Sequence, residues 1–224
     1  MGPLSAISAP LTSIFAPLDH PSRKAGTQAL DGRAAPMQAA VLIAALLIAS
    51  IVSVPLLGGR LGALADLRLR LVPLVVGALA VQIVVVNVLP GGSHTLHAVV
   101  LVVTYLVIAV ALIANRHIPG VKLIAAGGLA NFLAIIANGG VMPASASALR
   151  TAGLAADPAG YTNSGLVEHP HLAFLGDVFA LPASWPAANV FSIGDLLLAT
   201  GAFVLLHAVC GSRLGRLRAA GEPA

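Results

Sequence analysis

The sequence predicts an all-α membrane protein, a bundle of about five transmembrane helices with an extracytoplasmic loop or re-entrant cap. Three observations predict it: 58% of the 224 residues are hydrophobic, only 9% are charged, and the mean hydropathy is +0.96. Soluble domains carry roughly 25% charged residues because their surfaces face water. A chain with so few charges is therefore expected to use lipid as the solvent for much of its surface.

Five apolar stretches account for the predicted bundle, since a helix needs about 20 residues to cross a bilayer. Val-rich runs in the second and third stretches make strands the competing assignment. Half-buried strands alternate apolar and polar residues, and these runs do not alternate, so we expect helices. The predicted spans are residues 38–57, 71–89, 96–114, 121–139 and 190–209.

Basic residues are distributed unequally between the connections of this bundle. On the side opposite the C-terminal tail, Arg150 is the one basic residue in the connections between the predicted spans. The positive-inside rule then places the protein in the inner (plasma) membrane, with its C-terminus in the cytoplasm and its N-terminus outside. This orientation also accounts for the net charge of +4 without a nucleic-acid partner. The basic residues on the other side are Arg60, Arg68, Arg70, Arg116, Lys122, Arg213, Arg216 and Arg218.

Residues 1–36 do not fit this orientation, because they carry Arg23, Lys24 and Arg33. We interpret them as a disordered extension upstream of a translation start at Met37. The alternative is that the first apolar stretch is a signal peptide cleaved near residues 63–65, although its apolar run is longer than a signal core.

An extracytoplasmic segment is predicted over residues 140–189, and a cytoplasmic tail over 210–224. Gly139 and Gly140 are a helix stop signal, and Ser145 or Ser147 is a candidate N-cap for a short helix. The apolar run 172–182 is too short to span a bilayer and is interpreted as interfacial or re-entrant. Ser192 and Asp195 have the spacing of a capping box.

The candidate functional polar cluster consists of Asn138, Arg150, Asp177 and Asp195, which lie within this segment or a few residues outside it. No catalytic residue, metal site or cofactor is predicted. The metal alternative would use His169 and His171 together with Glu168 or Asp177 as zinc ligands, but the spacing is unspecific.

Four motifs, taken together and in this order, resemble a bacterial integral membrane family, the domain of unknown function 5317. They are residues 58–70 (GGRLGALADLRLR), 138–143 (NGGVMP) followed by 148–150 (ALR), 175–177 (LGD), and 191–195 (FSIGD). The resemblance covers about residues 37–209. It implies the helical architecture, and it implies no activity because the family has none assigned.

The favoured function is a multi-pass, non-enzymatic interaction or accessory component. Its expected partners are the lipid bilayer and a membrane protein, without nucleic acid or a small-molecule cofactor. The first alternative is a small transporter or permeation subunit with a polar path formed by Asn131, Asn138 and Asp195. The second alternative is a membrane enzyme with an outer-face site that uses His169, His171, Asp177 or Asp195.

Overall fold

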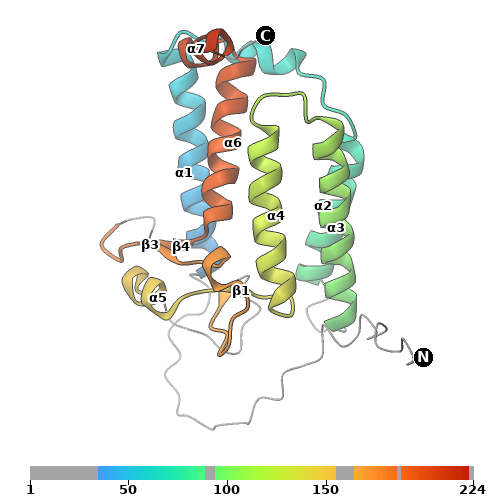
Figure 1. Ribbon diagram of the computed structural model, residues 1–224, viewed down its shortest axis with the longest axis vertical. Helices are drawn as coiled ribbons and strands as arrows, with labels where there is room; N and C mark the ends of the chain where they lie inside the picture. The colour runs from blue at the N-terminus through green and yellow to red at the C-terminus, as the bar shows by residue number, and fades with distance from the viewer. Residues whose placement is uncertain (1–34, 89–93, 155–163, 186–187, 222–224) are drawn as a thin grey trace, which may run out of the picture.

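The computed structural model describes residues 35–88, 94–154, 164–185 and 188–221, and five long helices run along its long axis (Figure 1). Each helix occupies one of the apolar stretches. Their bounds are α1 Ala35–Leu56, α2 Val72–Val88, α3 His94–Ala114, α4 Val121–Ala137 and α6 Ile193–Val209. The predicted extension 1–36 falls almost entirely outside the described residues.

The interpretation of these helices as membrane spans is wrong. Within the described ranges, no helix combines the length and the apolar character that crossing a bilayer requires. The helices α2, α4 and α6 have 17 residues each, so each rises about 25 Å where a hydrocarbon core is about 30 Å thick. The transmembrane fold class is corrected to a helical bundle with small β elements. The multi-pass inner-membrane location, with its cytoplasmic C-terminus and extracytoplasmic N-terminus, is not supported. The predicted spans 121–139 and 190–209 are longer than the helices observed there, because α4 ends at Ala137 and α6 begins only at Ile193.

The centre of the bundle is the antiparallel pair α4 and α6, which has the most extensive contact in the molecule. Two glycine pairs bring the two backbones together. Gly127 lies opposite Gly194, and a Cβ atom added at Gly127 would lie 2.5 Å from the Gly194 carbonyl oxygen. Seven residues along each helix, Gly120 lies opposite Gly201, where an added Cβ at Gly201 would lie 2.9 Å from the Gly120 carbonyl oxygen. Only glycine permits so close an approach of two helices.

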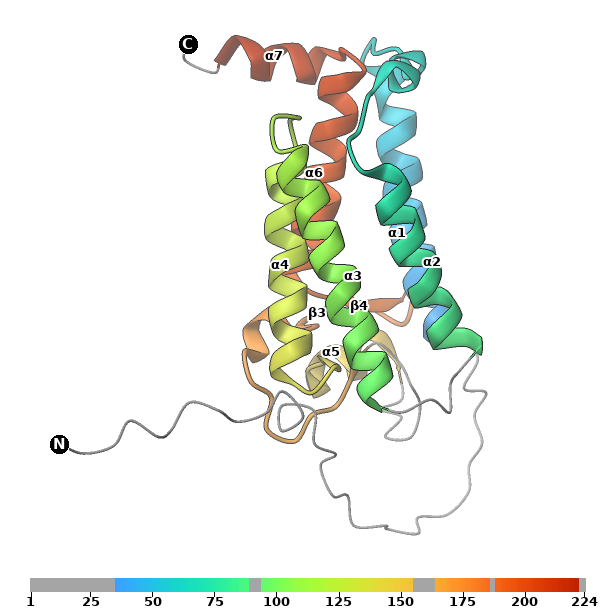
Figure 2. The same ribbon diagram turned by 90° about the vertical axis from the view of Figure 1, so that its right-hand side faces the viewer.

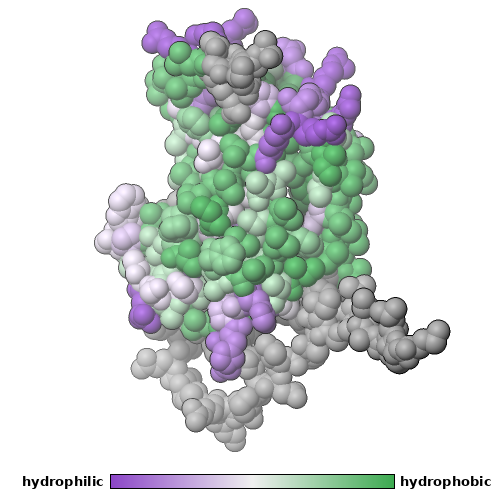
Figure 3. Space-filling view, viewed as in Figure 1, coloured by the Kyte–Doolittle hydropathy of each residue, from purple (hydrophilic) through white to green (hydrophobic). Residues whose placement is uncertain are grey.

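The other long helices pack on this pair or on one another: α1 packs on α6, α3 packs on α4, and α2 packs chiefly on α3. Figure 2 shows α3 between α4 and α2. Many aliphatic side chains of α1, α2 and α3 remain exposed, and hydrophobic residues cover the sides of the helices in Figure 3. Polar residues gather at the two ends of the bundle.

One end of the bundle carries a small α/β cap, which contains α5 Ala146–Ala152. Ser145 is the N-cap of α5 and its side chain accepts a hydrogen bond from the Ala148 amide, as predicted. The cap also contains β1 Met142–Pro143, β2 Ser164–Gly165, η3 Ala173–Leu175, β3 Phe179–Leu181 and β4 Asn189–Phe191. The strands form two pairs, β1 with β2 in parallel and β3 with β4 antiparallel, with Phe179 opposite Phe191.

The cap has its own hydrophobic core, formed where α5 packs on β3 and β4. The buried members are Ala144, Ala148, Leu149, Ala152 and Val190. The run 172–182 therefore folds into η3 and β3 and pairs with β4. The prediction of a re-entrant or interfacial membrane element there is wrong, because its backbone groups bond within the cap.

The opposite end of the bundle carries η2 Leu61–Asp66 and α7 Arg213–Gly221. Two hydrogen bonds join the elements there: the Arg60 amide donates to the Cys210 carbonyl at 2.8 Å, and the Arg213 amide donates to the Leu57 carbonyl at 2.9 Å. This end holds the chain leaving α1 against the chain leaving α6.

Candidate functional site

A closed polar network joins α4 to the start of α6. The side-chain amide of Asn131 donates from Nδ2 to one carboxylate oxygen of Asp195 at 2.8 Å, and the Ser192 hydroxyl donates to Oδ1 of Asn131 at 2.9 Å. The second carboxylate oxygen of Asp195 accepts the Ser192 amide at 3.0 Å, while the Asp195 amide donates to the Ser192 hydroxyl at 3.0 Å. The predicted capping box is therefore confirmed, and Asn131 extends it to a second helix.

Gly194 makes this network possible. A Cβ atom at Gly194 would collide with the side-chain oxygen of Asn131. Asp195 also lies in the first turn of α6, where an acidic side chain interacts favourably with the helix dipole. The network thus fixes α4 and α6 at one end of their contact, which is a structural use of Asp195.

Tyr105 of α3 lies close to the same network. Burial, and second the negative charge of Asp195, raise the pKa of the Tyr105 phenol. Its ring contacts Phe132 of α4, with centroids 4.9 Å apart. Tyr105 therefore stays protonated at neutral pH and brings a neutral hydroxyl into the neighbourhood of the carboxylate.

The structure places the other predicted cluster residues at different points of the cap. Asn138 exchanges two hydrogen bonds with the backbone of His171, accepting at 2.9 Å and donating at 2.8 Å. Asp177 is 4% exposed, and its backbone bonds to that of Pro143 at 2.8 Å. Arg150 is exposed on α5. Asp195 has Asn131 and Ser192 as its hydrogen-bond partners. The four-residue cluster stays a prediction, and so does the polar path through Asn131, Asn138 and Asp195.

The described part of the cap gathers no group of three His, Cys, Asp or Glu side chains that could hold a metal ion. His169 and His171 are both exposed, and the backbone of His171 bonds to Asn138. The zinc alternative therefore has no assembled ligand set among the residues that the structure describes.

A second polar cluster, which the sequence analysis did not predict, centres on His207 near the other end of α6. Its Nδ1 lies 2.8 Å from the Ser212 hydroxyl and its Nε2 lies 3.1 Å from the Ser53 hydroxyl of α1. The Ser53 hydroxyl also donates to the Ser50 carbonyl at 2.8 Å, and the Ser212 hydroxyl accepts the Gly215 amide at 3.2 Å. The Ser212 hydroxyl also lies 3.3 Å from the His207 carbonyl, which it can reach as a donor. A neutral imidazole that donates from Nε2 to Ser53 and accepts at Nδ1 fits the shorter of the two Ser212 contacts.

Burial decides the charge of this cluster. His207 is 2% exposed and Ser212 is fully buried. Desolvation lowers the pKa of His207 and raises the pKa of the neighbouring Cys210 thiol. Both groups are therefore neutral at pH 7, and the cluster links α1, α6 and α7 without a buried charge.

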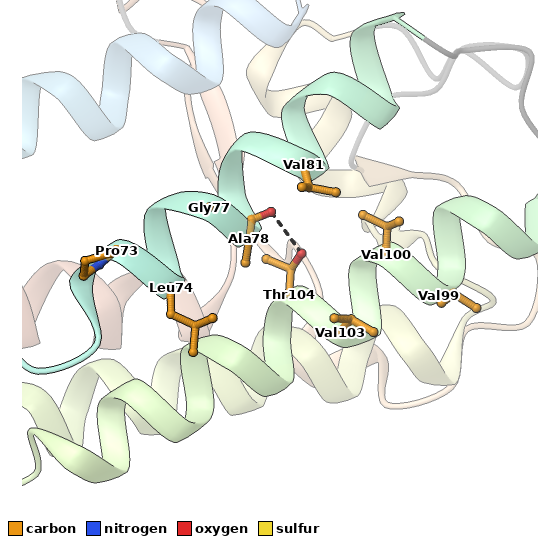
Figure 4. Close-up of a pocket in the computed structure, with 9 residues that line it drawn as sticks. All are labelled: Pro73, Leu74, Gly77, Ala78, Val81, Val99, Val100, Val103 and Thr104. Carbon is orange, nitrogen blue, oxygen red and sulfur yellow. Dashed lines mark hydrogen bonds between the residues drawn. The ribbon is translucent and has the colours of Figure 1, made fainter.

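The surface between α2 and α3 is hollowed into an apolar groove of about 310 Å³ (Figure 4). On α2 it is lined at one helical face, with spacing i, i+3, i+4, i+7. Its polar contribution is the Thr104 hydroxyl, which donates to the Ala78 carbonyl at 3.4 Å. The lining residues, here called the α2–α3 groove, are Pro73, Leu74, Gly77, Ala78, Val81, Val99, Val100, Val103 and Thr104.

Comparisons with known proteins identify relatives without an assigned activity. The model of a family described as "Family of unknown function (DUF5317)" matches residues 66–207. An uncharacterized protein of Thermotoga maritima is 32% identical over 90 residues, which are 40% of this chain and 52% of that protein. The chain thus spans about half the length of this curated relative. No solved structure matches the chain.

Proposed function

This chain belongs to the family of unknown function DUF5317, and from that premise we propose that it is a non-enzymatic protein that binds a partner protein through the α2–α3 groove. The family assigned from the four motifs is confirmed over residues 66–207, whereas the first motif begins before that range and the bacterial and membrane character of the family is not part of the match. The family description names no chemistry, so the proposal depends on the physical character of the surface.

The observation that carries the proposal is that exposed branched aliphatic side chains line both walls of a hollow between two helices. Leu74 is 50% exposed, Val81 54% and Val103 51%. Contiguous exposed apolar surface is unfavourable in water, and on folded proteins it marks places where another molecule binds. The exposed aliphatic side chains of this groove are therefore expected to be covered by a partner.

The shape of the groove favours a helix with an apolar face as the bound element. The lining includes Gly77 and Ala78, and the space beside Gly77 is open, since an added Cβ would meet nothing within 4 Å. Small residues between larger ones let a third helix approach closely, and helices pack by inserting ridges into such grooves. Thr104 already has a hydrogen-bond partner, so it needs no polar group from the ligand.

The test uses aspartate substitutions that make the groove polar. Val81→Asp and Val103→Asp lie on opposite walls, and the matched control is Val52→Asp on α1, where Val52 is 51% exposed. Each tagged full-length variant is recovered from cells of its natural host, and the co-purifying proteins are quantified by mass spectrometry.

We expect one protein to co-purify in stoichiometric amount with the wild type and the Val52→Asp control, and to be lost with both groove variants. Circular dichroism checks that all variants remain helical. Equal recovery from all four proteins, or equal loss from all three variants, would contradict binding in the groove.

A further inference from the structure

The α7 end of the bundle carries a concentration of positive charge that the proposed groove does not use. All of its described cationic side chains are exposed, and Asp66 is the one carboxylate among the described residues of this end, so the net formal charge there is six positive. Hydrophilic residues crowd this end of the molecule in Figure 3. The cationic residues, here called the basic end, are Arg60, Arg68, Arg70, Arg116, Lys122, Arg213 and Arg216.

Hydrogen bonds fix the backbone positions from which several of these side chains project. The amides of Arg60 and Arg213 bond to the Cys210 and Leu57 carbonyls, as described above. Asn115, which is 5% exposed, accepts the Arg70 amide at 2.9 Å and donates to the Arg70 carbonyl at 3.0 Å. The basic end is therefore a partly preorganised array, and preorganisation reduces the ordering cost of binding.

Six of the seven cationic residues are arginine, and this choice favours particular anions. A guanidinium offers donors in a planar fork that matches the two oxygens of a carboxylate or phosphate, whereas a lysine ammonium is a point charge. Such an array also attracts anionic partners over a distance and speeds their association.

Exposed leucines are interleaved with the arginines at the same end. Along α7, Arg213 and Arg216 are spaced i, i+3, and so are Leu214 and Leu217, which are 41% and 70% exposed. In the loop that precedes α2, Leu69 lies between Arg68 and Arg70 and is 44% exposed. A nucleic-acid backbone offers nothing to cover these aliphatic groups, whereas a protein segment that carries both acidic and apolar side chains does.

We propose that the basic end binds an acidic amphipathic segment of a protein partner, with carboxylates on the arginines and aliphatic side chains on the exposed leucines. The fixed backbone positions favour a folded segment, whose charges have fixed spacing, over a fluid anionic surface, whose charges rearrange. This surface is separate from the α2–α3 groove, and the inference stands without it.

The probe for this proposal is a fluorescein-labelled synthetic helical peptide with Glu and Leu on adjacent faces. Binding to the full chain is followed by fluorescence anisotropy at increasing salt. The charge-reversal variant is Arg213→Glu, which keeps the backbone bond to Leu57 and places an acidic residue favourably in the first turn of α7. The matched control is Arg150→Glu at the cap, which changes the net charge by the same amount.

We expect Arg213→Glu to weaken peptide binding by roughly three- to tenfold, Arg150→Glu to leave it within about twofold, and salt to weaken it steadily. A peptide with Gln in place of Leu should bind more weakly than the original. The proposal is overturned if both variants weaken binding equally, or if Val81→Asp abolishes binding that Arg213→Glu leaves intact. It is also overturned if an oligonucleotide or anionic lipid vesicles show the Arg213 dependence and the peptide does not.

Discussion

Gly127 and Gly128 are neighbours in α4 whose substitution by alanine should have opposite effects. A Cβ at Gly127 would lie 2.5 Å from the Gly194 carbonyl oxygen and 2.9 Å from the Leu198 amide, whereas a Cβ at Gly128 would meet nothing within 4 Å. The atoms opposing Gly127 belong to the backbone of α6, so the two helices must move apart. Overpacking of this kind costs about 1–3 kcal/mol, while replacing a helical glycine with alanine gains about 0.5–1 kcal/mol.

We therefore expect Gly127→Ala to lower the free energy of unfolding by up to about 2.5 kcal/mol and Gly128→Ala to raise it by about 0.5–1 kcal/mol. The difference between the variants isolates the overpacking term, because the helix-propensity term is common to both. Thermal unfolding followed by circular dichroism measures it, at about 2–4 °C per kcal/mol for a chain of this size. If Gly127→Ala were as stable as Gly128→Ala, the close approach of α4 and α6 would be refuted.

Three further predictions concern individual polar side chains. Burial lowers the pKa of His207, so the unfolded chain binds more protons than the folded one, and the free energy of unfolding should fall as the pH drops below about 6.5. In urea denaturation between pH 7.5 and 5, His207→Gln should reduce this dependence of stability on pH. An unchanged dependence would assign it to other groups. Asp195→Asn removes a charge that raises the pKa of Tyr105, so phenolate absorbance should appear at lower pH than in the wild type, and an identical titration would contradict the proximity. Asn115→Leu loses three bonds to backbone atoms and should lower the free energy of unfolding by about 2–4 kcal/mol, whereas a loss below about 0.5 kcal/mol would show that water replaces them.

Signals confined to neighbouring residues were predictable from the sequence. The helix stop after α4 depends on Gly139 and Gly140, whose φ angles of 67° and 95° are in the left-handed region. The N-cap at Ser145 and the capping box at Ser192 depend on side chains that bond three residues along the chain. Each signal involves one turn of backbone, so it can be recognised in the local sequence without the rest of the fold.

Tertiary contacts were not predictable from a single chain. Asn131 binds Asp195, 64 residues away, and Ser53 lies beside His207, 154 residues away. Nothing in either local sequence names the other partner, although polar residues within apolar helices indicate that a partner exists. The membrane interpretation failed because the apolar stretches do not show where each helix begins and ends: α2, α4 and α6 have only 17 residues each.

The dependence of α2 on α3 for most of its packing has a consequence for how the molecule opens. An element that buries little surface against the centre can unfold, or detach with its neighbour, at a free energy below that of the whole domain. Amide hydrogens of α2 should therefore exchange with solvent sooner than those of α4 and α6, whose backbones are in direct contact. The α2–α3 hairpin then constitutes a cooperative unit of low local stability, and occupancy of its groove would be visible as slowed exchange in α2.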